Sequence, residues 1–174
     1  MNETKFDQLG FAYFPIFVRH KNKPTMRSTD FKIDTGANCT TISKDFLAEL
    51  GYDENWVKSG KHLVGGSRPT VVSGLPLDDC YEVHLPEVLI GDWVGYNWPV
   101  ITSLSANFRF LLGTDSMQFF NWHFDYGNGT FSFDLIPGKR RLLFNKAEQS
   151  IHAIDDAVSV KFPEQVLAFE ISNK

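Results

Sequence analysis

Asp34-Thr35-Gly36 is the part of this sequence whose residue types could do chemistry. Strand-forming residues end at Ile33, so Asp34 is expected where a buried strand stops. Gly36 permits backbone angles that a side chain would forbid, and the triplet therefore predicts a tight loop. A carboxylate held at a turn between apolar segments is costly unless something uses it. The alternative is an Asx-turn, in which Asp34 bonds only its own backbone.

A single carboxylate is a poor catalyst of amide cleavage, because the reaction needs a base that activates water and an acid that protonates the leaving nitrogen. Two carboxylates about 3 Å apart that share one proton can do both. The sequence has no second Asp-Thr-Gly or Asp-Ser-Gly, and Asp115 is followed by Ser116, which favours a helix start there. A catalytic Asp34 therefore needs a second copy of the chain, related by a two-fold axis.

Two further motifs follow the triplet. The pair Gly65-Gly66 lies in a predicted hairpin with arms at 62–64 and 70–72, and residues 107–113 are an apolar segment that ends in Leu-Leu-Gly. With these three motifs in this order, the chain resembles the retropepsin-like aspartic proteases, the clan that includes retroviral proteases and their cellular and bacterial relatives. The resemblance covers residues 11 to 136.

The resemblance implies an all-β fold: a single-domain, closed β-barrel-like acid-protease half with one or two short helices and a β-hairpin flap. The retropepsin-like domain is then residues 1–136. Residues 137–174 form a C-terminal extension outside the resemblance, and three interpretations of it stay open: an extra hairpin, a dimer-forming element, or an interaction arm.

The activity implied by the resemblance is that of an aspartic endopeptidase, in which two Asp34 carboxylates activate water at a homodimer axis. It implies catalytic roles for Asp34, Thr35 and Gly36, and substrate binding by Ala37, Gly65, Gly66 and Ser67. Peptide or protein substrates and a second copy of the chain are the implied partners. The alternative is a catalytically inactive module of the same fold that binds peptides or serves as a scaffold.

The sequence departs from the retroviral members at two positions. Those enzymes carry an acidic residue after the alanine of the loop and an arginine after Leu-Leu-Gly, which resemble an ion pair between the two segments. Here the positions hold Asn38 and Thr114, so that pair is missing. The departure leaves the loop chemistry intact and bears on the architecture of the dimer.

The elements expected to position these residues follow from apolar periodicity and turn residues. Asn128-Gly129 is the strongest hairpin signal. A polar loop is expected at 53–61. Helices are expected at 44–50 and 114–121, and strands at 11–20, 26–34, 39–42, 80–90, 93–95, 98–101, 107–113, 122–126 and 130–135.

Composition excludes several function classes. The 174 residues are 43% hydrophobic with a net charge of −4 and no dense basic block, which argues against nucleic acid as a partner. No apolar run approaches the roughly 18 residues that span a bilayer, and the N-terminus opens no secretory signal. With only two cysteines, a cytoplasmic location is predicted. The five histidines lack metal-ligand spacing, so no metal or cofactor is expected.

Overall fold

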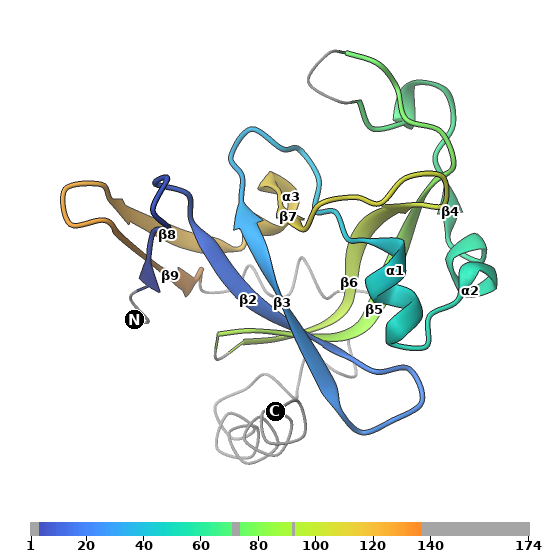
Figure 1. Cartoon of the computed structure of the whole chain (residues 1–174), viewed down its shortest axis with the longest axis horizontal. Helices are drawn as coiled ribbons and strands as arrows, with labels where there is room; N and C mark the ends of the chain where they lie inside the picture. The colour runs from blue at the N-terminus through green and yellow to red at the C-terminus, as the bar shows by residue number, and fades with distance from the viewer. Residues whose placement is uncertain (1–3, 71–73, 92, 137–174) are drawn as a thin grey trace.

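The computed structural model describes residues 4–70, 74–91 and 93–136, and within these ranges strands dominate (Figure 1). Three short α-helices are α1 (Lys44–Glu49), α2 (Glu54–Lys58) and α3 (Thr114–Met117), and Gly65–Ser67 forms a 3-10 turn. The strands are β1 (Thr4–Lys5), β2 (Tyr13–Arg19), β3 (Met26–Ile33), β4 (Lys61–His62), β5 (Cys80–Ile90), β6 (Trp93–Ser103), β7 (Leu111–Leu112), β8 (Phe120–Asp125) and β9 (Thr130–Leu135).

The strands form two sheets. The larger has the order β4-β5-β2-β3-β7, with β6 paired to β5, and the smaller has the order β1-β9-β8. Figure 1 shows the smaller sheet beside the end of β2 at which residues 7–12 lie. The all-β expectation is confirmed, and among the described residues both sheets are open, with no closed barrel found.

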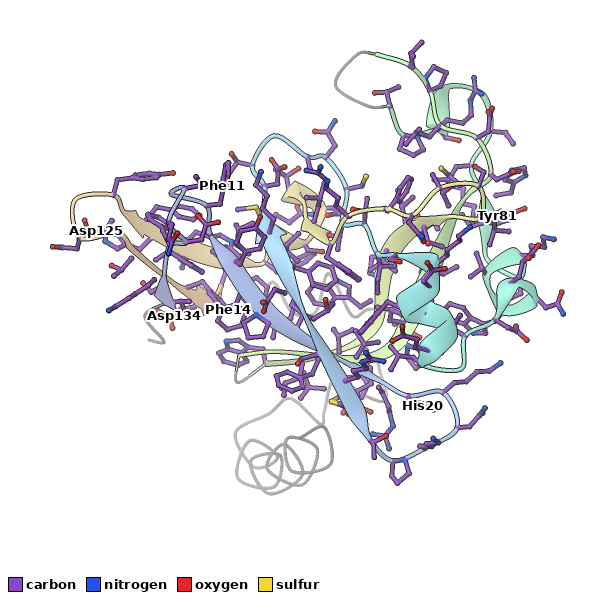
Figure 2. The ribbon with its side chains drawn as sticks, viewed as in Figure 1. Phe11, Phe14, His20, Tyr81, Asp125 and Asp134 are labelled. Atoms are coloured by element: carbon purple, nitrogen blue, oxygen red, sulfur yellow. The ribbon has the colours of Figure 1, made fainter. Side chains whose placement is uncertain are left out.

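Strand β2 shows how the sequence builds the core. Its residues alternate between exposed or half-buried and buried, because successive side chains of a strand point to opposite faces. Phe14 on the buried face contacts Phe133 of β9 at 4.8 Å between ring centroids and thereby joins the two sheets (Figure 2). The predicted strands at 11–20 and 26–34 are confirmed as β2 and β3.

The long hairpin of β5 and β6 extends the large sheet. Both strands have 11 residues and pair along most of their length. The two strands predicted at 93–95 and 98–101 are therefore one, β6. Pairing is interrupted where Pro86, which has no N–H, lies opposite Asn97, whose φ is 51°.

The prediction of a polar loop at 53–61 is wrong, because these residues contain α2. Asp53 caps this helix by accepting a hydrogen bond from the Trp56 N–H (2.9 Å). The Trp56 ring packs against the Tyr52 ring, with 4.4 Å between the ring centroids, and Val57 is buried. With five residues, α2 is too short to show an apolar period, and the Asp53 cap was the available signal.

Three other predicted elements are shorter than expected or absent. Residues 39–42 form no strand, and Thr41 alone makes isolated bridges, to Ile101 and Leu111. The apolar segment 107–113 contributes only Leu111–Leu112 as β7. The helix expected over 114–121 ends at Met117, because Phe120 already begins β8.

The hairpin around Asn128-Gly129 is confirmed. Strands β8 and β9 pair from Phe120↔Leu135 to Asp125↔Thr130. In the turn, the Asp125 carboxylate accepts hydrogen bonds from the backbone N–H and the side-chain amide of Asn128 (3.0 and 2.7 Å), and Gly129 has a φ of +67°. Strand β1 was not predicted, and it pairs with β9.

The predicted extension at 137–174 lies outside the described residues. No helix of the described part of the chain is long and apolar enough to span a membrane. The predicted cytoplasmic location stays a prediction.

Candidate active site

Asp34 lies directly after β3, where the central strands of the large sheet end. Strand β3 pairs in parallel with β7, with Ile33 opposite Leu112. The Asp34 N–H then donates to the Leu112 carbonyl oxygen (3.0 Å), and the Ile33 N–H donates to the Ala12 carbonyl oxygen (2.8 Å). Asp34 therefore follows a strand held on both sides, which fixes the position of its backbone.

The carboxylate of Asp34 is oriented by its own loop. Its Oδ1 accepts a hydrogen bond from the Gly36 N–H (2.9 Å), and its backbone oxygen accepts one from the Ala37 N–H (3.2 Å). The Asx-turn is therefore present. Asp34 Oδ2 accepts no hydrogen bond from the described residues, so one carboxylate oxygen is held while the other is open. The side chain is half-buried, whereas Thr35 and Gly36 are exposed.

The far half of the loop is held by the segment after β7. The Thr114 N–H donates to the Ala37 carbonyl oxygen (2.8 Å). Gly113 lies so close to the loop that a Cβ there would be 2.4 Å from the Cys39 carbonyl oxygen. Leu112 is fully buried beneath. The glycine of Leu-Leu-Gly thus permits a backbone contact that any side chain would prevent.

A buried polar cluster, which sequence reasoning missed, also joins the two segments. Asp115 accepts hydrogen bonds from the backbone N–H of Thr40 (3.0 Å) and from its hydroxyl (2.8 Å). Asp115 also lies in the first turn of α3, as predicted, and its Oδ1 accepts the Ser116 N–H (2.8 Å). No local pattern could have paired Thr40 with Asp115, because they are 75 residues apart.

Cys39 lies in the same loop and is a half-exposed free thiol. Burial of the sulfur raises the pKa of the Cys39 thiol to about 11, with smaller contributions from the negative charge of Asp115 and from Cys80. Because the thiolate is the reactive form, the raised pKa of the Cys39 thiol disfavours a nucleophilic role at neutral pH.

Alkylation of Cys39 by iodoacetamide is expected to be slow near neutral pH. The pKa of the Cys39 thiol is about 11 in the folded protein and 9.0 for an unperturbed cysteine, which stands for the denatured chain. At a pH of about 8 the folded protein therefore holds roughly 10²-fold less thiolate, and the alkylation rate should fall in proportion. The rate should rise until the pH passes the raised pKa. Peptide mass mapping of the labelled protein measures it, with fully buried Cys80 as the internal comparison. A native rate equal to the denatured rate would contradict the assignment.

The predicted flap differs in detail from the hairpin expected around Gly65-Gly66. Gly65–Ser67 form a 3-10 turn, in which Gly65 has a φ of +58° and all three residues are exposed. The chain reverses further on, where Thr70 bridges Pro76 and the Leu77 N–H donates to the Pro69 carbonyl oxygen (2.9 Å). Part of the expected second arm, 71–72, lies outside the described residues.

We call the described residues 63–70 and 74–79 the flap arm. It begins where the Leu63 N–H donates to the Cys80 carbonyl oxygen (2.8 Å), and Arg68 and Asp78 join its two limbs through an ion pair of 2.7 Å. Figure 1 shows the arm extending beyond β4, on the side of the sheets where loop 34–40 also lies. No hydrogen bond joins the arm to residues 34–37 within the described residues, so the structure brings together Asp34 to Ala37 but not the glycine pair.

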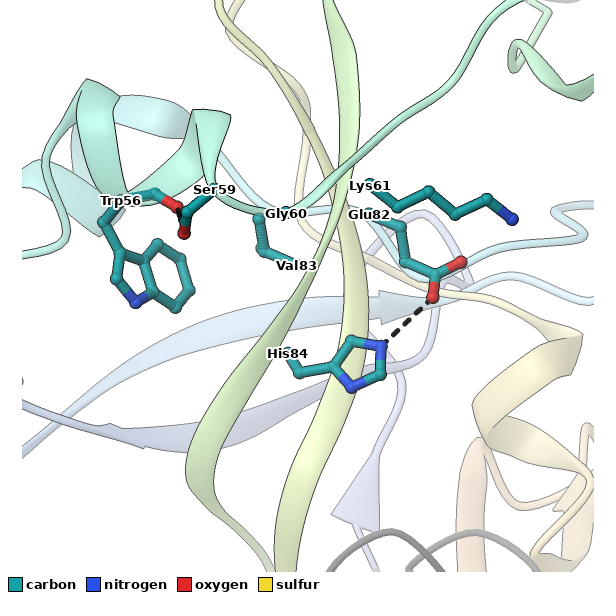
Figure 3. A pocket seen from close by; sticks show the side chains of 7 residues that line it. All are labelled: Trp56, Ser59, Gly60, Lys61, Glu82, Val83 and His84. Atoms are coloured by element: carbon teal, nitrogen blue, oxygen red, sulfur yellow. Dashed lines mark hydrogen bonds and ion pairs between the residues drawn. The ribbon is translucent and has the colours of Figure 1, made fainter.

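An open pocket of about 370 Å³ lies elsewhere, between α2, β4 and β5 (Figure 3). His84 Nε2 and Glu82 Oε1 are 3.1 Å apart in it. None of the predicted site residues lines it. Among the described residues, no group of three or more His, Cys, Asp or Glu side chains could hold a metal ion. The pocket is lined by Trp56, Ser59, Gly60, Lys61, Glu82, Val83 and His84.

No family model matches the sequence, and no curated protein matches it. Among solved structures, the chain is similar to the crystal structure of a retropepsin-like aspartic protease from Rickettsia conorii, with a TM-score of 0.54. The chain has a retropepsin-like fold. The match covers 75% of this chain and 86% of the other, at 21% sequence identity, so it shows the retropepsin-like fold and leaves the activity to be argued from the site.

Proposed function

We propose that this protein is an aspartic endopeptidase whose active site forms from the Asp34 loops of two copies of the chain. The observation that carries the proposal is the state of the Asp34 carboxylate, which is oriented through Oδ1 by the Gly36 N–H and has an open Oδ2. The retropepsin-like fold supports it, because Asp34 follows a central strand of that fold.

The chemistry requires the two carboxylates to hold one proton between them. The ionised carboxylate takes a proton from water while the water oxygen attacks the carbonyl carbon of the peptide bond, and the protonated carboxyl gives its proton to the carbonyl oxygen. The tetrahedral intermediate then breaks its carbon–nitrogen bond as the first carboxyl passes its proton to the leaving nitrogen, while the second carboxylate takes a proton from a hydroxyl of the intermediate. Each Asp34 acts as an acid in one step and as a base in the other.

The neighbours of Asp34 have supporting roles in this proposal. Thr35 is exposed at the tip of the loop, where its hydroxyl is accessible to a second copy. Gly36 orients the carboxylate, and its backbone and that of Ala37 offer hydrogen-bonding groups to an extended peptide. Gly65, Gly66 and Ser67 are assigned to substrate binding through closure of the flap arm.

Exposed apolar side chains lie on the flap arm and on the segment beside the Asp34 loop. Phe11 packs against Lys32, whose Nζ lies 4.1 Å from the ring centroid, next to the loop (Figure 2). Exposed apolar side chains that gather beside a site offer contacts to the apolar groups of a ligand. They favour a peptide substrate with apolar residues. The exposed side chains are Leu9, Phe11 and Tyr13 beside the loop and Val64 and Leu75 on the arm.

Self-association tests the proposal, because one Asp34 cannot supply both an acid and a base. Sedimentation at micromolar to high-micromolar concentrations should show dimers. Thr35→Arg should weaken the dimer by more than about tenfold, since like charges would face each other across the axis. Asn22→Arg, an equal charge change on the exposed turn between β2 and β3, should not. A wild type that stays monomeric over this range would favour the inactive peptide-binding module.

A further inference from the structure

We propose that Asp115 is a positioning residue, whose carboxylate holds the Asp34 loop in place through Thr40. The catalytic consequence rests on the proposed function, whereas the effect on the loop does not. Asp115 touches neither Asp34 nor any position assigned to substrate, and it acts through the hydrogen bonds of the buried polar cluster, which consists of Thr40, Gly113, Asp115 and Ser116.

Three donors converge on the two oxygens of Asp115. The Thr40 backbone N–H donates to Oδ2 (3.0 Å), while the Thr40 hydroxyl and the Ser116 backbone N–H both donate to Oδ1 (2.8 Å each). Thr40 and Ser116 are each 1% exposed, whereas Asp115 is half-buried, so the donors of these bonds are shielded from water. Hydrogen bonds to a charged group are among the stronger ones in proteins, and a buried donor left without a partner is costly.

The hydroxyl hydrogens of the cluster have one consistent arrangement. The single hydrogen of the Thr40 hydroxyl is used toward Asp115, so its oxygen must accept at its other contacts. It accepts the Gly113 N–H (3.2 Å) and, at 2.7 Å, the Ser116 hydroxyl hydrogen. The chain of donors ends on the carboxylate, which makes Asp115 the acceptor on which the cluster depends.

The cluster holds the end of the Asp34 loop together with the sheet, because the Ile101 N–H donates to the Thr40 carbonyl oxygen (2.9 Å) and the Thr41 N–H donates to the Leu111 carbonyl oxygen (2.9 Å). The beginning is fixed by the bond from the Asp34 N–H to Leu112, and the middle by the bond from the Thr114 N–H to Ala37. Thr40 follows this middle part of the loop and directly precedes Thr41, which bridges Ile101 and Leu111. Because the reacting groups of an enzyme tolerate little displacement, a shift of about 1 Å in such a loop lowers turnover by roughly 10²-fold.

An amide cannot replace this carboxylate. In one orientation of Asp115→Asn, the NH₂ group takes the place of Oδ2 and faces the Thr40 N–H. In the other orientation it takes the place of Oδ1 and faces the Ser116 N–H. Both are backbone donors that cannot rotate away, so each orientation sets two donors against each other. A conservative change should therefore be disruptive.

Hydrogen exchange on the full chain tests the effect on the loop without an activity assay. Asp115→Asn and Thr40→Val should speed exchange of the Asp34, Ala37 and Thr41 amides by at least about tenfold. Thr40→Ser keeps both donors and should stay within about twofold of the wild type. Tyr52→Phe is the matched control: it removes one buried hydrogen bond, to the Arg19 carbonyl oxygen (2.8 Å), at the far end of β2.

The inference would be overturned if the loop amides of Asp115→Asn and Thr40→Val exchanged no faster than those of Tyr52→Phe. Should Asp115→Asn fail to fold, the contrast between Thr40→Val and Thr40→Ser decides: a difference of about tenfold supports the inference, and equal behaviour overturns it.

Peptide cleavage tests the catalytic consequence. Asp115→Asn and Thr40→Val should lower kcat by about 10²-fold and leave KM within about threefold, while Thr40→Ser restores kcat. A folded Asp115→Asn with wild-type kcat would overturn the positioning role. If the wild type cleaves nothing, the proposed function fails, and the exchange experiment still decides whether Asp115 holds the loop.

Discussion

Replacing Asp34 with asparagine is expected to lower peptide cleavage by at least about 10³-fold, the scale lost when a positioned catalytic group is removed. An amide cannot accept the proton of water, so the dyad loses its base. The fold should survive, because the amide oxygen can still accept the Gly36 N–H as Oδ1 does (2.9 Å). Cleavage of a diverse peptide library by wild type and variant, from about pH 4 to about pH 8, measures the loss.

Asp30→Asn is the control for this substitution. Asp30 lies on the same strand, β3, and is exposed, so the variant makes the same charge change away from the loop. Its cleavage rate should stay within about twofold of the wild type, as for ordinary surface substitutions. Equal cleavage by wild type and Asp34→Asn would contradict the endopeptidase proposal. A dimeric wild type that cleaves nothing would contradict it too.

Gly113→Ala is expected to cause the largest loss of stability, about 3 kcal/mol in the free energy of unfolding. The added Cβ would lie 2.4, 2.5 and 2.8 Å from the O, C and N atoms of Cys39. These are backbone atoms, so no side-chain rotation relieves the contact. Either Gly113 or the loop must move. Urea unfolding of the two proteins at one temperature measures the difference.

Gly66→Ala is the matched control for this change. It also adds one methyl group to a glycine, but nothing lies within 4 Å of the new Cβ. Its free energy of unfolding should change by no more than about 0.5 kcal/mol. If the two alanine variants have the same stability, the close contact between Gly113 and Cys39 is not a constraint on the fold.

Local sequence determined much of the fold. The alternation of buried and exposed residues in β2 and the Asn128-Gly129 turn act over a few residues, so both elements could be predicted. The loop at Asp34 was predictable for the same reason, since Gly36 donates to a carboxylate only two residues away. The short helix α2 was missed because five residues show no period, although Asp53 marked its start.

Tertiary structure alone decided how the loop is supported and where the flap arm turns. Residues 39–42 look like a strand, yet only Thr41 bridges β6 and β7, while the backbone of Cys39 lies against Gly113 and Thr40 bonds Asp115. The arm reverses between Thr70 and Pro76 and not at the glycine pair. The partners Thr40 and Asp115 are 75 residues apart, and they meet only because the parallel pairing of β3 with β7 brings the two segments together. Short-range patterns carry no information on such a pairing, because its free energy comes from burial and hydrogen bonds that form only after the sheet is assembled.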